Sequence, residues 1–208
     1  QSTYDWCNST GGNTAAFDFT TKGILQEAVR NREYWRLSDS QGNPAGFCGS
    51  WPTHAVTFLE NHDTGSTLQH WPFPTERLPE GYAYILTHPG TPTVFYDHWK
   101  DHALQEDIQR LIDIRRRVGL KCNAAVQIQK AEDGCYAAHV GHPAVGVERG
   151  ACKEIDMSKP SLCMKLGPAD WSPNQGRVGD TKWKVMASGD GWAVWENVRF
   201  LSAEQRAR

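Results

Sequence analysis

Acidic and histidine side chains follow directly on an apolar run. Residues 55–59 (Ala-Val-Thr-Phe-Leu) have the character of a fully buried strand, and the polar segment 60–63 (Glu-Asn-His-Asp) comes immediately after it. Taken alone, this segment could be half of a metal site, an acid and base cluster, or a polar loop in which Asp63 or Thr64 caps a helix. The residue types leave these three interpretations open.

A second apolar run ends in the same way. Residues 93–96 (Thr-Val-Phe-Tyr) predict a strand, and Asp97 and His98 follow it. The carboxyl ends of parallel strands lie on one face of a sheet or barrel, and the functional residues of such folds gather there. We therefore expect the two polar segments to share a face.

Strand-like and helix-like stretches alternate through the first 120 or so residues, which is typical of a parallel α/β fold. Residues 15–19 predict a strand, and Thr20 and Thr21 are candidate caps for a helix from Lys22 to about Leu37. Two further helices are predicted, over residues 81–87 and over residues 104–118, the second ending at Gly119.

The pattern changes at about residue 125 to short β-rich runs separated by Gly, Pro and Asp, which predicts a small antiparallel β domain. The predicted division is an α/β part over residues 1–121, the β domain over residues 122–197, and a loose polar tail over residues 198–208. The predicted β runs are 126–129, 135–140, 162–166, 183–186 and 192–195.

Charge and hydropathy exclude several classes of partner. With 22 Lys and Arg against 24 Asp and Glu, the net charge of −2 creates no field that would attract nucleic acid or an acidic membrane, and no basic stripe is present. No run approaches the roughly 18 apolar residues of a membrane span. A neutral partner fits this composition better.

Tryptophan and cysteine usage adds two further indications. Nine Trp are more than a core of this size needs, and indole faces suit the apolar faces of sugar rings, although we expect most of them in the core. Six irregularly spaced Cys with no CxxC pair indicate neither a zinc site nor a dense disulfide framework, and they favour a reducing compartment. The sequon at residues 8–10 would matter only in a secreted chain.

The segment 56–66 (Val-Thr-Phe-Leu-Glu-Asn-His-Asp-Thr-Gly-Ser) resembles the motif of the seventh strand in plant and algal α-amylases, because strand, acid, histidine and following loop all match. The resemblance covers nearly the whole chain and is to the C-terminal half of the family. Further segments resemble the family in the same order: 17–25, 71–74, 81–92, 94–98 and 193–196.

The resemblance implies a fold and an activity. The fold would be the C-terminal part of a (β/α)8 TIM barrel (strands 6–8), followed by a small antiparallel β domain. The family hydrolyses internal α-1,4 bonds of starch-like glucans with retention of configuration. By resemblance, Asp63 would stabilise the transition state and His62 would bind the same sugar ring.

Two groups that retaining chemistry requires have no counterpart in this sequence. The family's nucleophilic Asp and general acid Glu follow the fourth and fifth strands, and no segment here resembles either motif, so we expect the chain to be inactive alone. The family calcium ligands belong to the same N-terminal half, so no metal site and no cofactor is predicted. The alternative is a non-catalytic structural or glucan-binding component of a larger assembly.

Two segments depart from the family. Relatives carry a tandem Trp before the seventh strand as a surface starch platform, whereas this chain keeps only Trp51 there, which makes Trp51 a candidate for a weaker surface glucan site. Residues 141–154 form a longer connection than in relatives. That connection is either a tolerated loop of the β domain or a surface for a specific partner.

A barrel reduced to three strands leaves apolar faces uncovered, which predicts a covering partner. The expected partners are an α-glucan and either the N-terminal half of the barrel or another protein over the open side. The segment 171–195 resembles plastid relatives more than secreted ones, so a plastid location is expected, with secretion as the alternative. The side chains expected to be uncovered are those of Phe17, Val56, Phe58, Val94 and Phe95.

Overall fold

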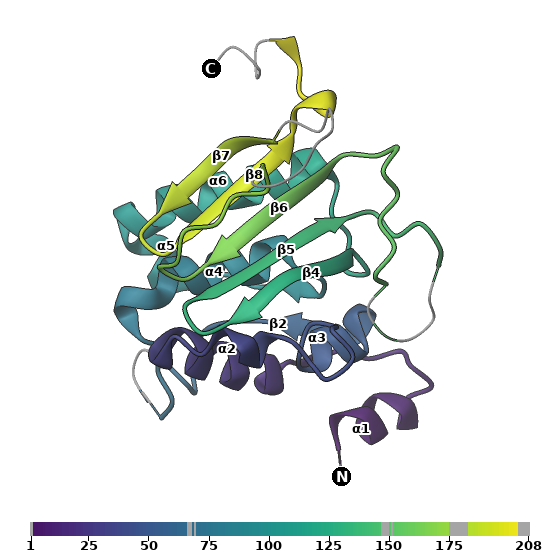
Figure 1. Ribbon diagram of the computed structural model, residues 1–208. Helices are drawn as coiled ribbons and strands as arrows, with labels where there is room; N and C mark the ends of the chain where they lie inside the picture. Colours follow the sequence, from purple (N-terminus) through teal and green to yellow (C-terminus); the bar gives the residue numbers. More distant parts are fainter. Residues whose placement is uncertain are drawn as a thin grey trace.

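Two sheets of different kinds organise the chain (Figure 1), for which the computed structural model describes residues 2–65, 68, 70–146, 150, 152–174 and 183–203. A small parallel sheet has the order β1-β2-β3, and a five-stranded antiparallel sheet has the order β4-β5-β6-β8-β7. The predicted α/β part followed by an antiparallel β sheet is thereby confirmed. The parallel strands are β1 (Ala16–Phe17), β2 (Ala55–Thr57) and β3 (Thr91–Pro92).

Helices accompany the parallel strands, as alternating strand and helix segments require. The longest two are α2, after β1, and α6, after β3. The α-helices are α1 (Thr3–Ser9), α2 (Phe19–Asn31), α3 (Phe47–Ser50), α4 (Leu78–Thr87), α5 (Tyr96–Lys100) and α6 (His102–Val118). The short 3-10 turns are η1 (Tyr34–Leu37), η2 (Pro52–His54), η3 (Thr75–Arg77) and η4 (Val198–Phe200).

The first predicted helix differs from the structure at both ends. Asp18, not Thr20 or Thr21, caps helix α2, and its carboxylate accepts the Thr21 N–H at 2.8 Å and the Cys48 N–H at 2.7 Å. The helix ends at Asn31, because Arg32 takes a left-handed conformation with a φ of 60°. The segment predicted as one helix to Leu37 is therefore a helix followed by the η1 turn.

The third parallel strand is displaced from the predicted run at 93–96. The strand is Thr91–Pro92, paired with Val56 and Thr57, and Tyr96 already begins helix α5. The Thr93 N–H still donates to the Thr57 carbonyl at 2.9 Å, which is the last bond of this ladder. The length of β3 is limited by its partner β2, which has three residues. An apolar sequence pattern does not show where such a partner ends.

Helix α6 agrees with its amphipathic pattern. Asp101 caps it by accepting N–H groups of Ala103 and Leu104, and Gly119 ends it at a φ of 73° that glycine adopts without strain. Its apolar stripe is buried against helix α4 and the antiparallel sheet. The stripe consists of Leu104, Ile108, Leu111, Ile114 and Val118.

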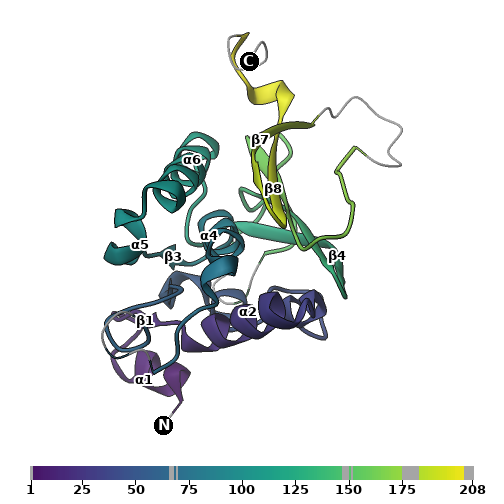
Figure 2. The ribbon, with the colours of Figure 1, turned by 90° about the vertical axis from the view of Figure 1, so that its left-hand side faces the viewer.

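Helix α4 lies between helix α6 and the antiparallel sheet (Figure 2). All of its residues except Pro79 are buried, including the carboxylate of Glu80. The Tyr34 hydroxyl and Arg77 donate to that carboxylate, Arg77 at 2.8 Å. One continuous core therefore joins the α/β part to the β sheet through this helix.

All five predicted β runs are strands of the antiparallel sheet, each within one to three residues of its predicted end. The strands are β4 (Ala125–Glu132), β5 (Cys135–Gly141), β6 (Ser161–Leu166), β7 (Trp183–Gly189) and β8 (Trp192–Asn197). Strand β5 is buried along its whole length, as expected for a central strand covered on both faces. The division at residues 121 and 122 stays a prediction.

The described part of the segment expected to be a loose tail, residues 198–203, makes defined contacts. The Asn197 side chain accepts the Arg199 N–H at 3.1 Å and starts the η4 turn, and Leu201 is buried after it. The prediction rested on the polar composition of the segment, which does not indicate such contacts. The remainder of the predicted tail lies outside the described residues.

The edge of the parallel sheet at β1 exposes apolar side chains, as expected for Phe17, which is 48% exposed. Phe58, also expected to be uncovered, is buried, because the rings of Phe17 and Phe19 contact its ring edge-on at centroid distances of 5.2 and 5.0 Å. Val56, Val94 and Phe95 are half-buried. Within the described ranges, no helix is long and apolar enough to cross a membrane.

The half-buried guanidinium of Arg115 provides a test of the fold. Arg115 donates to the carbonyls of Leu86, His88 and Gly90 at 2.8 to 3.0 Å, tying the end of α4 to the start of β3. In the full-length polypeptide, Arg115→Met should lower the free energy of unfolding by about 2–4 kcal/mol, since three carbonyls lose a charged donor. Arg116→Met, at the exposed neighbouring position, is the control. Equal urea midpoints for the two variants would contradict the assignment.

Candidate functional site

The polar segment after β2 forms a tight turn held by its own side chains. The Asn61 side-chain oxygen accepts the N–H groups of Asp63 and Thr64 at 2.9 and 3.1 Å, and the Thr64 hydroxyl accepts the Asn61 N–H at 3.0 Å. The Gly65 N–H donates to the Asn61 carbonyl at 3.0 Å. The segment is thus a polar turn at the carboxyl end of a strand, and among the described residues no helix begins at Asp63 or Thr64.

His62 and Asp63 stand on the outer side of this turn. Their side chains are 86% and 59% exposed, and the His62 Nε2 atom is 3.4 Å from an Asp63 carboxylate oxygen. The backbone of both residues is fixed while their side chains face solvent. This arrangement suits two groups that bind a ligand from outside rather than stabilise the fold.

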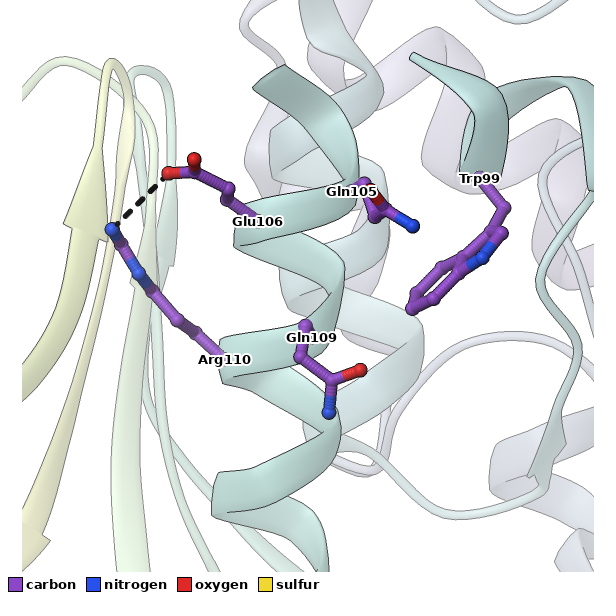
Figure 3. Close-up of a pocket in the computed structure, with 5 residues that line it drawn as sticks. All are labelled: Trp99, Gln105, Glu106, Gln109 and Arg110. Carbon is purple, nitrogen blue, oxygen red and sulfur yellow. Dashed lines mark ion pairs between the residues drawn. The ribbon is translucent and has the colours of Figure 1, made fainter. Parts of the chain in front are cut away.

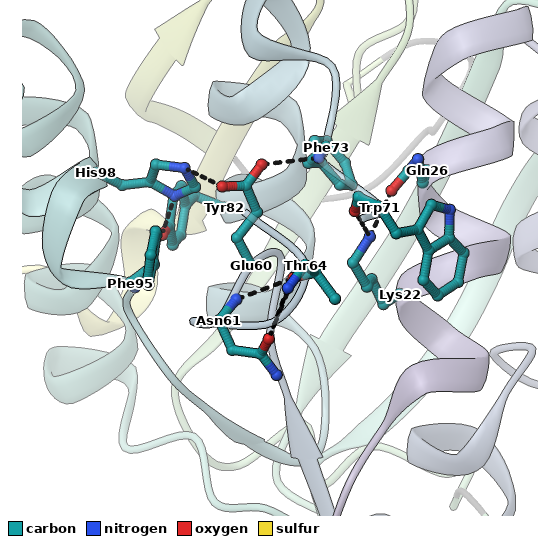
Figure 4. Close-up of polar contacts among 10 residues, drawn as sticks. All are labelled: Lys22, Gln26, Glu60, Asn61, Thr64, Trp71, Phe73, Tyr82, Phe95 and His98. Atoms are coloured by element: carbon teal, nitrogen blue, oxygen red, sulfur yellow. Dashed lines mark hydrogen bonds and ion pairs between the residues drawn. The ribbon is translucent and has the colours of Figure 1, made fainter. Parts of the chain in front are cut away.

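Glu60, the first residue of the segment, has the opposite environment. Its carboxylate is buried, with one oxygen accepting the Phe73 N–H at 2.8 Å and the other 3.2 Å from His98 Nε2 (Figure 4). A Cβ at position 65 would lie 1.9 Å from that second oxygen, so only glycine fits there. Burial raises the pKa of Glu60, but the hydrogen bonds from His98 and Phe73 and the charge of Lys22 outweigh it and hold the pKa below its ordinary value.

The two polar segments meet through buried side chains. The second nitrogen of His98, Nδ1, lies 2.8 Å from the Tyr82 hydroxyl, which accepts the Phe95 N–H at 3.2 Å. Asp97, next to His98, is exposed. The expectation that the two strand ends share a face is correct, but the direct contact is between Glu60 and His98.

Lys22 of helix α2 holds the far end of the same loop. Its ammonium donates to Gln26 at 2.5 Å and to the Trp71 carbonyl at 2.8 Å, and it lies 3.9 Å from the centre of the Trp71 ring. Burial lowers the pKa of Lys22 to about 8, against the opposing charge of Glu60. Sequence reasoning missed Lys22, and a possible signal was Gly23, where a Cβ would lie 2.8 Å from the Trp71 ring.

Trp51, the candidate for a surface glucan site, is only 5% exposed. Its indole packs on the His54 ring at a centroid distance of 4.0 Å, on Tyr4 at 5.6 Å, and on Phe47 at 6.2 Å. The structure therefore places Trp51 in a small apolar cluster rather than on a binding platform. The flanking helix α1, which supplies Tyr4, covers the indole, and sequence spacing gave no sign of that contact.

One hollow lies beyond the carboxyl end of β2, and another lies beside helix α6. The larger, with a volume of about 600 Å³, borders the Glu60 and His98 pair, and the smaller, of about 350 Å³, lies between Trp99 and helix α6 (Figure 3). The smaller one is lined by Trp99, Gln105, Glu106, Gln109 and Arg110, with an ion pair of 3.5 Å between Glu106 and Arg110. Neither hollow is lined by His62 or Asp63. In the part of the chain that the structure describes, no group of three or more His, Cys, Asp or Glu side chains could hold a metal ion.

Parallel strands with polar groups at their carboxyl ends, followed by an antiparallel sheet, define the class of protein: the end of a (β/α)8 barrel with its C-terminal β domain. A solved cyclomaltodextrin glucanotransferase with a three-domain ABC distribution has this fold. It matches 93% of this chain and 46% of its own length, with a TM-score of 0.58 and 16% sequence identity. At that identity the likeness concerns the fold alone.

Sequence comparison gives the family. The model of the alpha-amylase C-terminal beta-sheet domain matches residues 117–196. Alpha-amylase type B isozyme of Hordeum vulgare is 39% identical over 84% of this chain and all of its own length. The chain belongs to the α-amylase family, and the predicted resemblance to the C-terminal half of plant-type members is confirmed.

Two relatives from Arabidopsis thaliana are more similar still. Probable alpha-amylase 2 is 50% identical over 91% of this chain, and Alpha-amylase 3, chloroplastic, is 45% identical over 92% of it. This chain spans 41% of the length of the first and 19% of the length of the second.

The buried carboxylate makes stability depend on pH. The pKa of Glu60 is below its ordinary value in the folded state. The contribution of its ionised carboxylate to the free energy of unfolding is therefore complete above the unfolded pKa of about 4.3, and it is lost as the pH falls through the folded pKa. In the full-length polypeptide, Glu60→Gln should cost about 2 kcal/mol at pH 7 and progressively less below about pH 4. Urea unfolding across this range measures both values.

The matched control is Glu76→Gln, at an exposed carboxylate on the rim of the larger hollow. Its effect should be close to zero at every pH. A constant difference between wild type and Glu60→Gln from pH 7 to pH 3.5 would show that the ionised form of Glu60 contributes nothing.

Proposed function

We propose that this chain supplies Asp63 and His62 to the active site of an α-amylase that cleaves internal α-1,4 bonds of starch-like glucans with retention. The observation that carries the proposal is the rigid turn at the carboxyl end of β2, which exposes both side chains while fixing their backbone. In this proposal residues 1–121 belong to the barrel and residues 122–197 to its C-terminal β domain.

Each of the two side chains has a defined task. Positive charge develops on the sugar ring in the oxocarbenium-like transition state, and the Asp63 carboxylate stabilises that charge more than it stabilises the neutral substrate. His62 donates a hydrogen bond to the same ring. The nucleophile and the proton donor, about 5 Å apart in a retaining enzyme, come from the remainder of the barrel.

The edge strand β1 supports a covering partner. Exposed Trp6, Phe17 and Phe19 border a hollow of about 550 Å³ beside this edge, and an exposed apolar sheet edge pairs readily with other chains. The partner is the N-terminal half of the barrel. Its strands would bury these rings and bring its carboxylates to the face that carries Asp63.

A plastid location completes the proposal. It is supported by the similarity to Alpha-amylase 3, chloroplastic, at 45% identity. A fluorescent fusion of the full-length polypeptide that enters the secretory route instead of plastids would refute this part and leave the catalytic part untouched.

Substitution of Asp63 tests the catalytic part. In the full-length enzyme, Asp63→Asn should lower kcat by at least about 100-fold and change KM little, because the charge matters mainly in the transition state. Steady-state kinetics on soluble starch measure both constants, and the 208-residue chain alone, which should show no turnover, serves as the blank.

Asp97→Asn is the matched control, since Asp97 is an exposed carboxylate after the neighbouring strand. It should retain kcat within about two-fold. If Asp63→Asn keeps more than about a tenth of the wild-type kcat, Asp63 has no catalytic role, and a non-catalytic glucan-binding function becomes the better account.

A further inference from the structure

The loop that carries His62 and Asp63 is closed at its base by one buried carboxylate. Glu60 precedes the turn, and Phe73, whose N–H it accepts at 2.8 Å, follows the loop. A single side chain thus holds together the two ends of the Asp63 loop, defined as residues 61–72, of which the structure describes 61–65, 68 and 70–72. Inside the loop, the Trp71 N–H donates to the Thr64 carbonyl at 3.1 Å and narrows the base further.

His98 connects the Glu60 carboxylate to Tyr82 through its two ring nitrogens. The Tyr82 hydroxyl oxygen already accepts the Phe95 N–H, and we assign the neutral tautomer of His98 in which Nδ1 accepts the Tyr82 proton and Nε2 donates to Glu60. In this arrangement every donor has an acceptor. The chain of bonds anchors the loop base to helices α4 and α5, which carry Tyr82 and His98.

The opposite side of the loop is anchored independently. Lys22 of helix α2 donates to the Trp71 carbonyl at 2.8 Å, two residues before Phe73 (Figure 4). The loop base is thereby held between α2 on one side and α4 and α5 on the other. Neither Glu60 nor His98 exposes more than a tenth of its side chain, so neither is placed to bind substrate.

We propose that Glu60 and His98 are positioning residues, which fix Asp63 relative to the sugar ring by closing the base of its loop. This inference rests on the proposed function of Asp63. It adds the buried residues Glu60 and His98 to the Asp63 site as its structural support. Small displacements of a group that acts in the transition state lower kcat strongly, because the geometry is no longer held before reaction.

A pair of substitutions at His98 separates positioning from general stability. In His98→Gln the amide nitrogen replaces Nε2 and keeps the bond to Glu60, whereas in His98→Asn the shorter side chain replaces Nδ1 and keeps only the contact with Tyr82. Each variant loses one of the two hydrogen bonds of His98. A merely structural role predicts similar losses of activity for both.

The positioning role predicts different losses. In the full-length enzyme, His98→Asn should lower kcat at least 10-fold with KM within about two-fold of wild type, and His98→Gln should stay within about three-fold in kcat. Glu60→Gln should resemble His98→Asn, because one amide cannot accept from both the Phe73 N–H and His98. Glu76→Gln, exposed on the same rim, should match wild type.

Asp63→Asn, assayed in parallel, separates failure of this inference from failure of the proposed function. If Asp63→Asn abolishes turnover while His98→Asn and Glu60→Gln keep kcat within two-fold, the positioning role is overturned and the proposed function stands. Equal losses in His98→Asn and His98→Gln, or a rise in KM at constant kcat, also overturn it. If Asp63→Asn is active, the proposed function itself has failed. Should Glu60→Gln fail to fold, the His98 pair decides alone.

Discussion

Helix α4 imposes the main constraint on this structure, because it is buried around nearly its whole circumference. A helix of this kind is stable only when other elements cover every side, and here helix α6, helix α2 and the inner face of the antiparallel sheet do so. The one carboxylate it buries, Glu80, is satisfied by Tyr34 and Arg77. The β sheet is therefore part of the same core as the parallel strands and not an appended module.

The same helix connects the core to the candidate site. Tyr82, buried in the middle of α4, hydrogen-bonds His98, and His98 contacts Glu60 at the base of the Asp63 loop. Hydrogen bonds thus connect the packed core to the turn that carries an exposed carboxylate. Exposed catalytic groups on loops need such support, since their own side chains contribute nothing to holding the backbone.

Local patterns predicted most of the fold. The amphipathic helix ending at Gly119, the five β runs and the polar strand end with His62 and Asp63 all follow from neighbours in sequence. Positions set by distant partners did not follow. Asp18 competes successfully with Thr20 and Thr21 as a cap because it also accepts the N–H of Cys48, 30 residues away.

The same limit applied to the candidate site. The exposure of His62 and Asp63 fits the resemblance to α-amylases, whereas the support by Glu60 depends on His98, which lies on another helix, and on Phe73 beyond the loop. The burial of Trp51 likewise depends on contacts with Tyr4 of helix α1. No spacing rule contains these contacts, because they arise only when the chain has folded.

The contact between Glu60 and Gly65 has a consequence for how such a loop can change over evolutionary time. The carboxylate occupies the space that a Cβ at position 65 would need, with only 1.9 Å between them. A residue with a Cβ at position 65 is therefore acceptable only if the side chain at position 60 moves from its buried place. The effect of a substitution at either position on stability should therefore depend on which residue occupies the other.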